Sequence, residues 1–402
     1  MQVKVSLDFG SQVQEVGTLV YERERYFFKY AASFLSSGLE ISPLKLPLTA
    51  QIQEGPAHVF EGLFGVFNDS LPDGWGKLLA DRTFVNDGRA PSTVSALERL
   101  SLVGQKGNGA LIYEPITDQH PFPFKADLDL YAAQVQILLK EGQAGALDEL
   151  YLLGGNSVGA RPKVHVHYTE LGAELLAEPT PLSTPWIIKF RSTQDLLDAA
   201  KIEFVYYQMA LDCGIEMSSS RLFYGHTDQG YFGTLRFDQG PGWRKHFHSV
   251  SGLLHDNFRL STLDYGHLMD LANRLEKKLD SAEKIFRLAV FNLYAHNADD
   301  HTKNFGFLMN PSGEWCFSPA YDLTFSPAPN NCHQLSFAGA YHNPTATDLL
   351  KLASHFNISN PKQIIAEVKD ILTNFSHYAK FLDIRKQEAR LIEKTIQGTL
   401  KC

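Results

Sequence analysis

The chain has 402 residues, of which 44% are hydrophobic and 20% charged, and its formal net charge is -8 at pH 7. This composition is typical of a soluble globular protein with roughly two or three domains and sizeable cores. The negative balance argues against a surface built mainly to hold nucleic acid through its phosphates, although a local basic patch is compatible with it.

The four cysteines lie far apart and form no CxxC pair. This spacing indicates reduced thiols in a cytoplasmic protein rather than a disulfide frame or a zinc site. The first ten residues carry Asp8 and lack a long apolar core, so we expect no secretory signal. Since no run of about 18 apolar residues occurs, we expect neither a membrane span nor a membrane partner.

Short alternating segments predict a β-rich start over residues 1–60, with a hairpin near Glu22. Helices are predicted over 70–84, where Asp73 is the candidate N-cap, and from Ser92 as the N-cap of the next. A glycine-rich turn at 104–109 leads into a strand, and Lys106 is an ordinary residue of that turn. A further helix is expected over 127–142.

The pattern of predicted elements changes near residue 150. A glycine-rich turn leads into a strand at 164–168, followed by a dense apolar strand at 184–191 and a helix that Gly214 ends. Two more strands lie before residue 240, and the remainder is mostly helical. The helices expected there cover 261–279, 281–295, 345–356, 361–375 and a long final segment from about 378.

These elements predict an α+β protein in three parts. Residues 1–120 form a β-rich N-terminal subdomain, 121–240 a mixed α/β nucleotide-binding part, and 241–402 a helical lobe that carries the catalytic loop.

The segment "HNADDHTKNFGF" starts at His296 and follows a helix with apolar residues at i, i+3, i+4 and i+7. A buried helix delivers this polar loop into the interior or a cleft, where carboxylates need partners. A solvated turn is one interpretation. A metal hydrolase using His296 and His301 is another, but their spacing differs from HExxH and no third ligand is evident.

Phosphoryl transfer is the third interpretation. Asp299 and Asn304 have the D-x-x-x-x-N separation of a kinase catalytic loop, where the carboxylate accepts the hydroxyl proton and the amide holds Mg²⁺. Lys303 can lie near the transferring phosphate. A predicted hairpin then leads to Asp322, which has the place of the second Mg²⁺ ligand. The neighbouring Asp300 leaves the choice of base open on spacing alone.

The residues that a kinase needs to bind ATP offer an independent check of the phosphoryl-transfer interpretation. Lys189 lies within the apolar strand "WIIKF", where a lysine is costly unless it is paired, and Glu203 in the next helix could pair with it. Each residue alone has an ordinary explanation, an edge-strand lysine and a glutamate favoured by the helix dipole. Their order along the chain, followed by the D…N…D pattern, favours a kinase.

With these motifs the sequence resembles the HipA-type toxin kinases of bacterial toxin–antitoxin systems over nearly its whole length. The family pattern D-x-H-x-K-N falls on Asp299, His301, Lys303 and Asn304, which makes Asp299 the base. The segments that carry the resemblance are "VGTLVYERERYFFKYAASFLSSG", "FEGLFGVFNDSLPDGWGKLL", "GNGALIYEP", "SVGARPKVHV", "WIIKF", "LRFDQ", "DDHTKNFGF" and "PAYDLTFS".

The resemblance implies a serine/threonine protein kinase with a divergent kinase-like fold that uses ATP and Mg²⁺. It implies a protein substrate such as an aminoacyl-tRNA synthetase, and a HipB-type antitoxin through which alone the protein would reach DNA. Lys189 would be the ATP lysine, and Asn304 and Asp322 the Mg²⁺ ligands. The hinge would run from Leu235 through Phe237 to Asp238, with backbone groups at adenine and Asp238 near the ribose.

The segment "GGNSVGARPK" occupies the family's phosphate-side loop, in which a serine can be autophosphorylated. It is no Walker A motif, because Ala160 and Arg161 follow Gly159 in place of Lys and Ser/Thr. Glycine amides, including that of Gly159, can still cradle phosphate, with Arg161 and Lys163 adding charge. Ser157 is the candidate autophosphorylation site, although Asn156 can occupy the family position instead.

Two other functions stay open. A catalytically weak kinase fold could serve as a co-repressor or antitoxin-binding partner, but such a module has no need for the buried charge at Lys189 and Glu203. A small-molecule kinase is the other. The β-rich N-terminal region looks like a protein-interaction platform, which favours a protein substrate.

Overall fold

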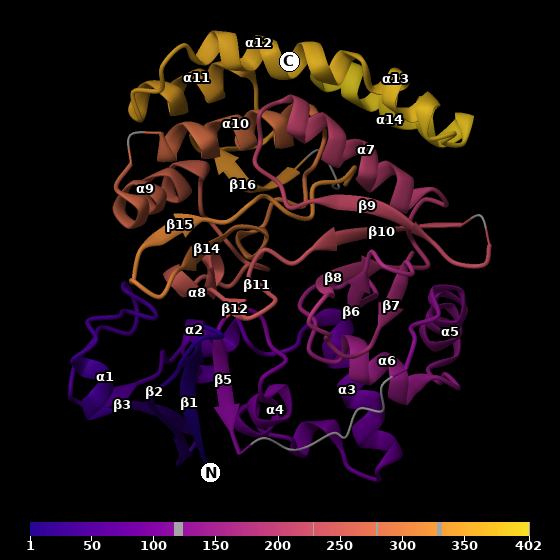
Figure 1. Cartoon of the computed structure of the whole chain (residues 1–402). Coiled ribbons are helices and arrows are strands. Elements are labelled where there is room, and N and C mark those ends of the chain that lie inside the picture. Colours follow the sequence, from indigo (N-terminus) through magenta and orange to yellow (C-terminus); the bar gives the residue numbers. More distant parts are fainter. Residues whose placement is uncertain (116–123, 228, 279, 328–331, 402) are drawn as a thin grey trace. The chain divides into compact units, whose positions relative to one another are not determined.

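The computed structural model describes residues 1–115, 124–227, 229–278, 280–327 and 332–401 (Figure 1). The chain forms two compact units, each built from segments far apart in the sequence. The first unit contains Met1–Asp195, Arg221–His255 and Leu308–Gly313, and the second contains Leu196–Ser220, Asp256–Phe307 and Glu314–Cys402. The three parts expected from the sequence, with boundaries at 120 and 240, stay a prediction.

The first unit begins with a five-stranded antiparallel sheet in the order β4-β3-β2-β1-β5. The expected hairpin is confirmed: Glu22 pairs with Arg25, and the two residues of the turn, Arg23 and Glu24, have positive φ angles of 51° and 62°. The strands are β1 (Gln2–Asp8), β2 (Val13–Glu22), β3 (Arg25–Tyr30), β4 (Gln53–Glu54) and β5 (Leu111–Glu114).

The first unit also contains several helices. The helix expected from Ser92 begins later, because Ser95 rather than Ser92 accepts the hydrogen bond from the amide of Glu98. These elements are α1 (Ala32–Leu35), α2 (Gly65–Asn68), α3 (Gly74–Asn86), α4 (Ala96–Val103), α8 (Val250–Leu254) and the 3-10 turns η1 (Phe60–Gly62) and η2 (Pro91–Thr93).

A second five-stranded sheet of the first unit has the order β7-β6-β8-β10-β9. Val164, Val166 and Ile188 on one face pack into a core with helices α3, α5 and α6. The opposite face carries Lys163 and Lys189, which are directly opposed in the β6–β8 pairing. The elements are β6 (Lys163–Thr169), β7 (Glu174–Leu176), β8 (Thr184–Lys189), β9 (Ser220–Tyr224), β10 (Gly230–Leu235), α5 (Leu128–Glu141) and α6 (Leu147–Gly154).

Three short strands follow this sheet in the sequence. A two-residue hairpin joins β11 (Gln239–Gly240) to β12 (Trp243–Arg244), and β13 (His246–Ser249) leads into α8. Helix α6 was not expected, and it ends at Gly154, in the region where the sequence predicted a glycine-rich turn.

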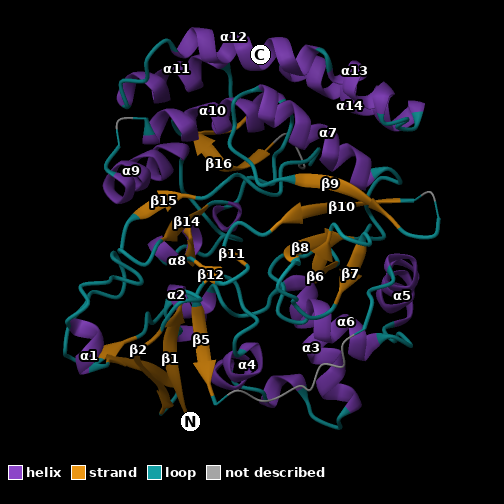
Figure 2. Cartoon of the chain, viewed as in Figure 1, coloured by secondary structure: helices purple, strands orange, loops and turns teal. Residues whose placement is uncertain are grey.

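The second unit is mostly helical, as the colouring of Figure 2 shows. Its central helix is α10 (Ser281–Tyr294), which is buried on nearly all sides as the sequence predicted and contacts α9, α11, α12 and α14. The helices around it are α7 (Ala199–Asp212), α9 (Tyr265–Glu276), α11 (Ala346–His355), α12 (Pro361–Thr373), α13 (Phe375–Phe381) and α14 (Lys386–Thr399).

The predicted single final helix is wrong, because α13 and α14 are separated at residues 382–385. Asp383 has a positive φ of 50°, which an α-helix cannot accommodate. The remaining elements are η3 (Thr302–Asn304), β14 (Gly306–Met309), β15 (Trp315–Phe317), β16 (Cys332–Phe337) and β17 (Ala340–His342), of which β16 and β17 were not expected.

Helices of the described residues are too short or too polar to cross a bilayer. Cys213, Cys316 and Cys332 are present as thiols, and Cys402 lies outside the described residues.

Candidate active site

The polar loop after α10 brings Asp299 and Asn304 together. Residues 302–304 form the 3-10 turn η3, and the side-chain Nδ2 of Asn304 donates to the backbone oxygen of Asp299 at 2.8 Å. This contact explains the D-x-x-x-x-N spacing, because it closes the loop between the two residues. It also leaves the side-chain oxygen of Asn304 as the atom that can coordinate a metal.

The two adjacent aspartates have different environments. The Asp299 side chain is 59% exposed, and its carboxylate lies 3.9 Å from the Nε2 of His301. The Asp300 carboxylate is buried and accepts hydrogen bonds from the Tyr265 hydroxyl at 2.8 Å, His333 Nδ1 at 2.9 Å and the Gln334 amide at 2.8 Å. The Asp300 carboxylate is therefore held within the fold, whereas the Asp299 carboxylate is open to solvent.

Asp322 lies in a segment that is joined to the polar loop of Asp299 and Asn304. The hydroxyl of its neighbour Tyr321 donates to the backbone oxygen of Lys303 at 2.8 Å. Farther along, the amide of Ser326 donates to the backbone oxygen of His296 at 3.1 Å. Asp322 itself has a φ of 55°, a conformation that is rare outside glycine and concentrates at functional sites.

Asn304 and Asp322 thus belong to adjoining segments of the second unit. Both offer oxygen ligands, which suits Mg²⁺ with water and phosphate oxygens completing its octahedron. Within the described residues, no group of three or more His, Cys, Asp or Glu side chains is arranged to hold a metal. The zinc hydrolase interpretation therefore still lacks its third ligand.

The histidines of the loop act in packing. The His301 ring lies 4.9 Å from that of Phe258, and the His296 ring 5.8 Å from that of Phe325. Burial, together with the nearby His333, lowers the pKa of His296. Lys303, within the loop, places its ammonium 5.1 Å from the centre of the Phe258 ring, a cation–π contact.

On the first unit, Lys189 and Lys163 project from the same face of the β6–β8 pair. Lys189 is buried at 8% exposure, and its ammonium lies 5.6 Å from the centre of the Phe232 ring. Glu203 is buried in helix α7, which belongs to the second unit. The Lys189–Glu203 ion pair therefore stays a prediction.

The expected phosphate loop is held by the start of helix α3. The amide of Gly159 donates to the Asp73 carboxylate, and the Trp75 amide donates to the Gly159 backbone oxygen at 3.0 Å. Asp73 has the N-cap position that the sequence predicted, but its side chain makes no bond to its own helix. Gly159 has a φ of 97°, which requires glycine.

Positive charge from Arg161 and Lys163 accompanies this loop, as expected. Lys163 donates from Nζ to the Val158 backbone oxygen at 2.6 Å, and Arg161 lies 3.5 Å from the Asp195 carboxylate. Ser157 is fully buried, and its hydroxyl donates to the backbone oxygen of Gly154. Phosphorylation of Ser157 therefore requires this part of the loop to open.

The predicted hinge lies at the end of β10. Leu235 pairs with Trp186, and the Phe237 ring lies 6.0 Å from that of Phe247. Asp238 binds Arg236 through both carboxylate oxygens, at 2.9 and 2.6 Å, and also accepts from the Gly109 amide at 2.6 Å.

Burial acts to raise the pKa of Asp238, but the charge and hydrogen bonds of Arg236, with the Gly109 amide, outweigh it and hold the pKa at about 2. Asp238 thus joins the hinge to the glycine-rich turn of the N-terminal region. Its predicted approach to a ribose would compete with these bonds.

Two family descriptions match the chain. The HipA N-terminal domain matches residues 8–114, and the HipA-like C-terminal domain matches residues 156–375. A serine/threonine-protein kinase toxin HipA of Shewanella oneidensis is 28% identical over 193 residues. That alignment covers 41% of this chain and 42% of the relative, so less than half of either protein is compared.

Solved structures extend the likeness to the whole fold. A chain of the Shewanella oneidensis complex of HipA, HipB and operator DNA has a TM-score of 0.70 at 17% identity, covering 99% of this chain and 96% of that one. The Helicobacter pylori proinflammatory kinase CtkA has a TM-score of 0.36 at 12% identity over 54% of this chain and 86% of its own.

The predicted α+β fold of the HipA type is thereby confirmed. Because the HipA-like C-terminal domain alone accounts for more than half of its residues, the chain belongs to the HipA family.

Proposed function

We propose that this chain is an ATP- and Mg²⁺-dependent serine/threonine protein kinase. One observation carries the proposal: the loop of Asp299 and Asn304 is joined through Tyr321 to the segment of Asp322. A base, an amide ligand and a second carboxylate in adjoining segments are the parts that phosphoryl transfer requires. A solvated turn would need none of these contacts.

In this mechanism, the exposed Asp299 carboxylate accepts the proton of the substrate hydroxyl, and Lys303 adds positive charge beside the transferring phosphate. On the first unit, Lys189 and Lys163 supply two cations for the phosphates of ATP, and the Gly159 loop supplies backbone amides. Mg²⁺ bound through Asn304 and Asp322 would neutralise charge on the phosphates.

The biological role that we propose is that of a toxin in a toxin–antitoxin pair. The likeness to a protein named as a kinase toxin, and to a chain solved with HipB and operator DNA, supports this role. We infer a HipB-type antitoxin as partner, contact with DNA only through it, and a protein substrate such as an aminoacyl-tRNA synthetase.

The proposal is tested by ATP turnover and by phosphoprotein labelling of a cell lysate, with wild type beside Asp299→Asn. We expect discrete labelled proteins with the wild type and none with the variant, because removing the base removes proton acceptance but little else. Equal labelling by both proteins would refute the assignment of Asp299. Absence of labelling by the wild type, together with tight binding of an antitoxin, would favour the co-repressor.

A further inference from the structure

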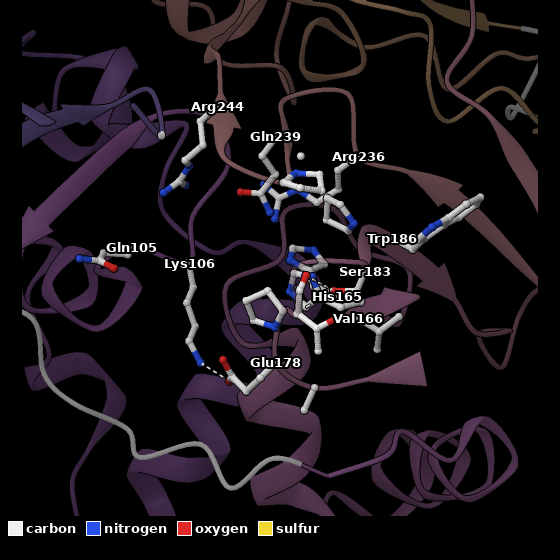
Figure 3. A pocket seen from close by; sticks show the side chains of 18 of the residues that line it. Gln105, Lys106, His165, Val166, Glu178, Ser183, Trp186, Arg236, Gln239 and Arg244 are labelled. Carbon is white, nitrogen blue, oxygen red and sulfur yellow. Dashed lines mark hydrogen bonds and ion pairs between the residues drawn. The ribbon is translucent and has the colours of Figure 1, made fainter. Parts of the chain in front are cut away.

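A cavity lies within the first unit beside the predicted hinge, and Arg236 of the hinge is among the residues that line it. Its volume is about 500 Å³, which is in the range of small-molecule sites. Figure 3 shows it between the glycine-rich turn that carries Lys106, strand β6 and the β11–β12 hairpin. Neither Lys163 nor Lys189 lines it, and neither does Gly159.

Two histidines of β6 line this cavity. His165 and His167 are two residues apart on the strand, so their side chains leave the same face. Within the described residues, the ring nitrogens of both histidines have no hydrogen-bond partner. Both side chains are partly exposed, so the two rings are open to a ligand or to water at the cavity.

Both imidazoles are neutral at pH 7. Burial, followed by the charge of Arg236, lowers the pKa of His165 to about 3 and that of His167 to about 4. Each ring therefore offers one N–H donor and one nitrogen acceptor. Perturbed histidines that face a cavity are candidates for a functional site.

The walls around the histidines carry positive charge. Lys106, Arg236 and Arg244 line the cavity. Arg236 is paired with the buried Asp238 at 2.6 Å, whereas Arg244 lies 3.8 Å from Asp8. In both pairs the arginine is among the residues that line the cavity.

Glu178 is the carboxylate that lines the cavity, at 3.5 Å from the Lys106 ammonium, a contact drawn in Figure 3. The charges that act on His167 come from Arg236 and Lys106, and both lower its pKa. At His165, Arg236 and Lys163 lower the pKa while Asp238 opposes them. Positive charge therefore outweighs negative charge at the two imidazoles, although each of the three cations also has a carboxylate neighbour.

Aromatic rings and prolines form much of the remaining lining. Trp186 and Trp243 contribute aromatic rings, and the indole nitrogen of Trp186 is already bonded to the Thr184 hydroxyl at 2.9 Å. Prolines form much of the remaining wall: Pro179, Pro181, Pro185 and Pro241. Such a surface suits the uncharged body of a ligand and loses little entropy when it binds one.

We propose that this cavity binds a small molecule with an anionic group, a phosphate or a carboxylate. The anionic group lies beside Lys106 and accepts a hydrogen bond from His167, while the apolar body packs on the prolines. The ligand anion replaces Glu178 as the partner of the lysine. Because an anion favours the imidazolium form, its binding raises the pKa of His167.

The test is NMR titration of the histidine ring protons of the full chain, with inorganic pyrophosphate and citrate as separate probes at up to about 10 mM, ten times a millimolar Kd. His165→Asn and His167→Asn assign the two resonances. We expect both resonances to move and the pKa of His167 to rise by about one unit. A response to pyrophosphate alone identifies phosphate as the ligand chemistry, and a response to citrate alone identifies carboxylate.

Lys106→Met should weaken the response about fivefold, as the loss of one ion pair predicts. Lys125→Met is the matched control, because Lys125 is also an exposed lysine paired with a glutamate but lies outside the cavity. Lys189→Met, which removes the predicted ATP lysine, should leave the response unchanged and so separates this site from kinase activity. No movement with either anion, or equal movement in the Lys106→Met protein, would overturn the proposal.

Discussion

Asp299 and Asp300 are neighbours in the chain, yet the side chain of Asp299 is 59% exposed and that of Asp300 is 0% exposed. The hydroxyl of Tyr265 and the ring of His333 hold the Asp300 carboxylate, so it has no route to a substrate. We therefore expect substitution of Asp299 to affect activity and substitution of Asp300 to affect stability, so the two variants can be compared.

For Asp299→Asn we expect phosphoryl transfer to fall by about 10²–10⁴-fold, the usual contribution of a general base. The melting temperature should stay near that of the wild type, because the exposed carboxylate makes no buried hydrogen bond. ATP affinity, measured by calorimetry, should be largely preserved. A variant that transfers phosphate at the wild-type rate would place the base elsewhere.

For Asp300→Asn we expect a loss of about 2–3 kcal/mol in the free energy of unfolding. The new amide group meets donors on Tyr265, His333 and Gln334, and its own N–H₂ finds donors where it needs acceptors. Urea unfolding beside Asp299→Asn measures the difference. Equal stability of the two variants would show that the Asp300 network contributes nothing to the fold.

Local patterns in the sequence predicted the parts of the site that depend on spacing. Asp299 and Asn304 are five residues apart and are joined by a hydrogen bond across one turn, so their spacing alone carries the geometry. Helix α10 was likewise visible, because its apolar residues recur with the helical period.

Contacts between distant residues left no such signal. Tyr265 and His333 reach Asp300 from 35 and 33 residues away, and Gly109 reaches Asp238 from 129 residues away. The break between α13 and α14 was missed for a similar reason. The amphipathic pattern continues past Asp383, and only its left-handed backbone shows that one helix has ended.

His246 predicts how stability depends on pH. It is fully buried, its Nε2 donates to the Ile41 backbone oxygen at 2.8 Å, and burial, followed by the charge of His248, lowers its pKa from 6.5 to about 3. Above pH 6.5 both the folded and the unfolded forms are neutral. As pH falls below 6.5, only the unfolded chain takes up the proton, so the free energy of unfolding falls until about pH 3.

The slope from this group is about 1.4 kcal/mol per pH unit below pH 6.5. We expect His246→Gln, which retains an N–H donor, to reduce the slope of unfolding free energy between pH 6 and 4.5 by that amount, whatever its stability at pH 7. Urea unfolding at several pH values measures this. Parallel slopes for the two proteins would show that His246 is protonated in the folded state.

The phosphate loop leads to the last prediction. Ser157 is buried with its hydroxyl on the Gly154 backbone oxygen, and the same loop is held at Gly159 by the Asp73 carboxylate. If the protein autophosphorylates at Ser157, the loop must first leave Asp73. Asp73→Ala removes this restraint, so we expect it to speed the modification, whereas Ser157→Ala abolishes it.

Intact-mass analysis during incubation with Mg·ATP follows the reaction, and peptide mapping locates the phosphate. Asp81→Ala is the control, because Asp81 lies on the same helix but pairs with Arg99 at 2.6 Å instead of with the loop. A phosphate on Ser157 would then sit beside Arg161 and Lys163, where its charge finds cations once the loop is open and repels the phosphates of ATP. If the wild-type protein and the Asp73→Ala variant are both active and both leave Ser157 unmodified, Ser157 is not the autophosphorylated residue.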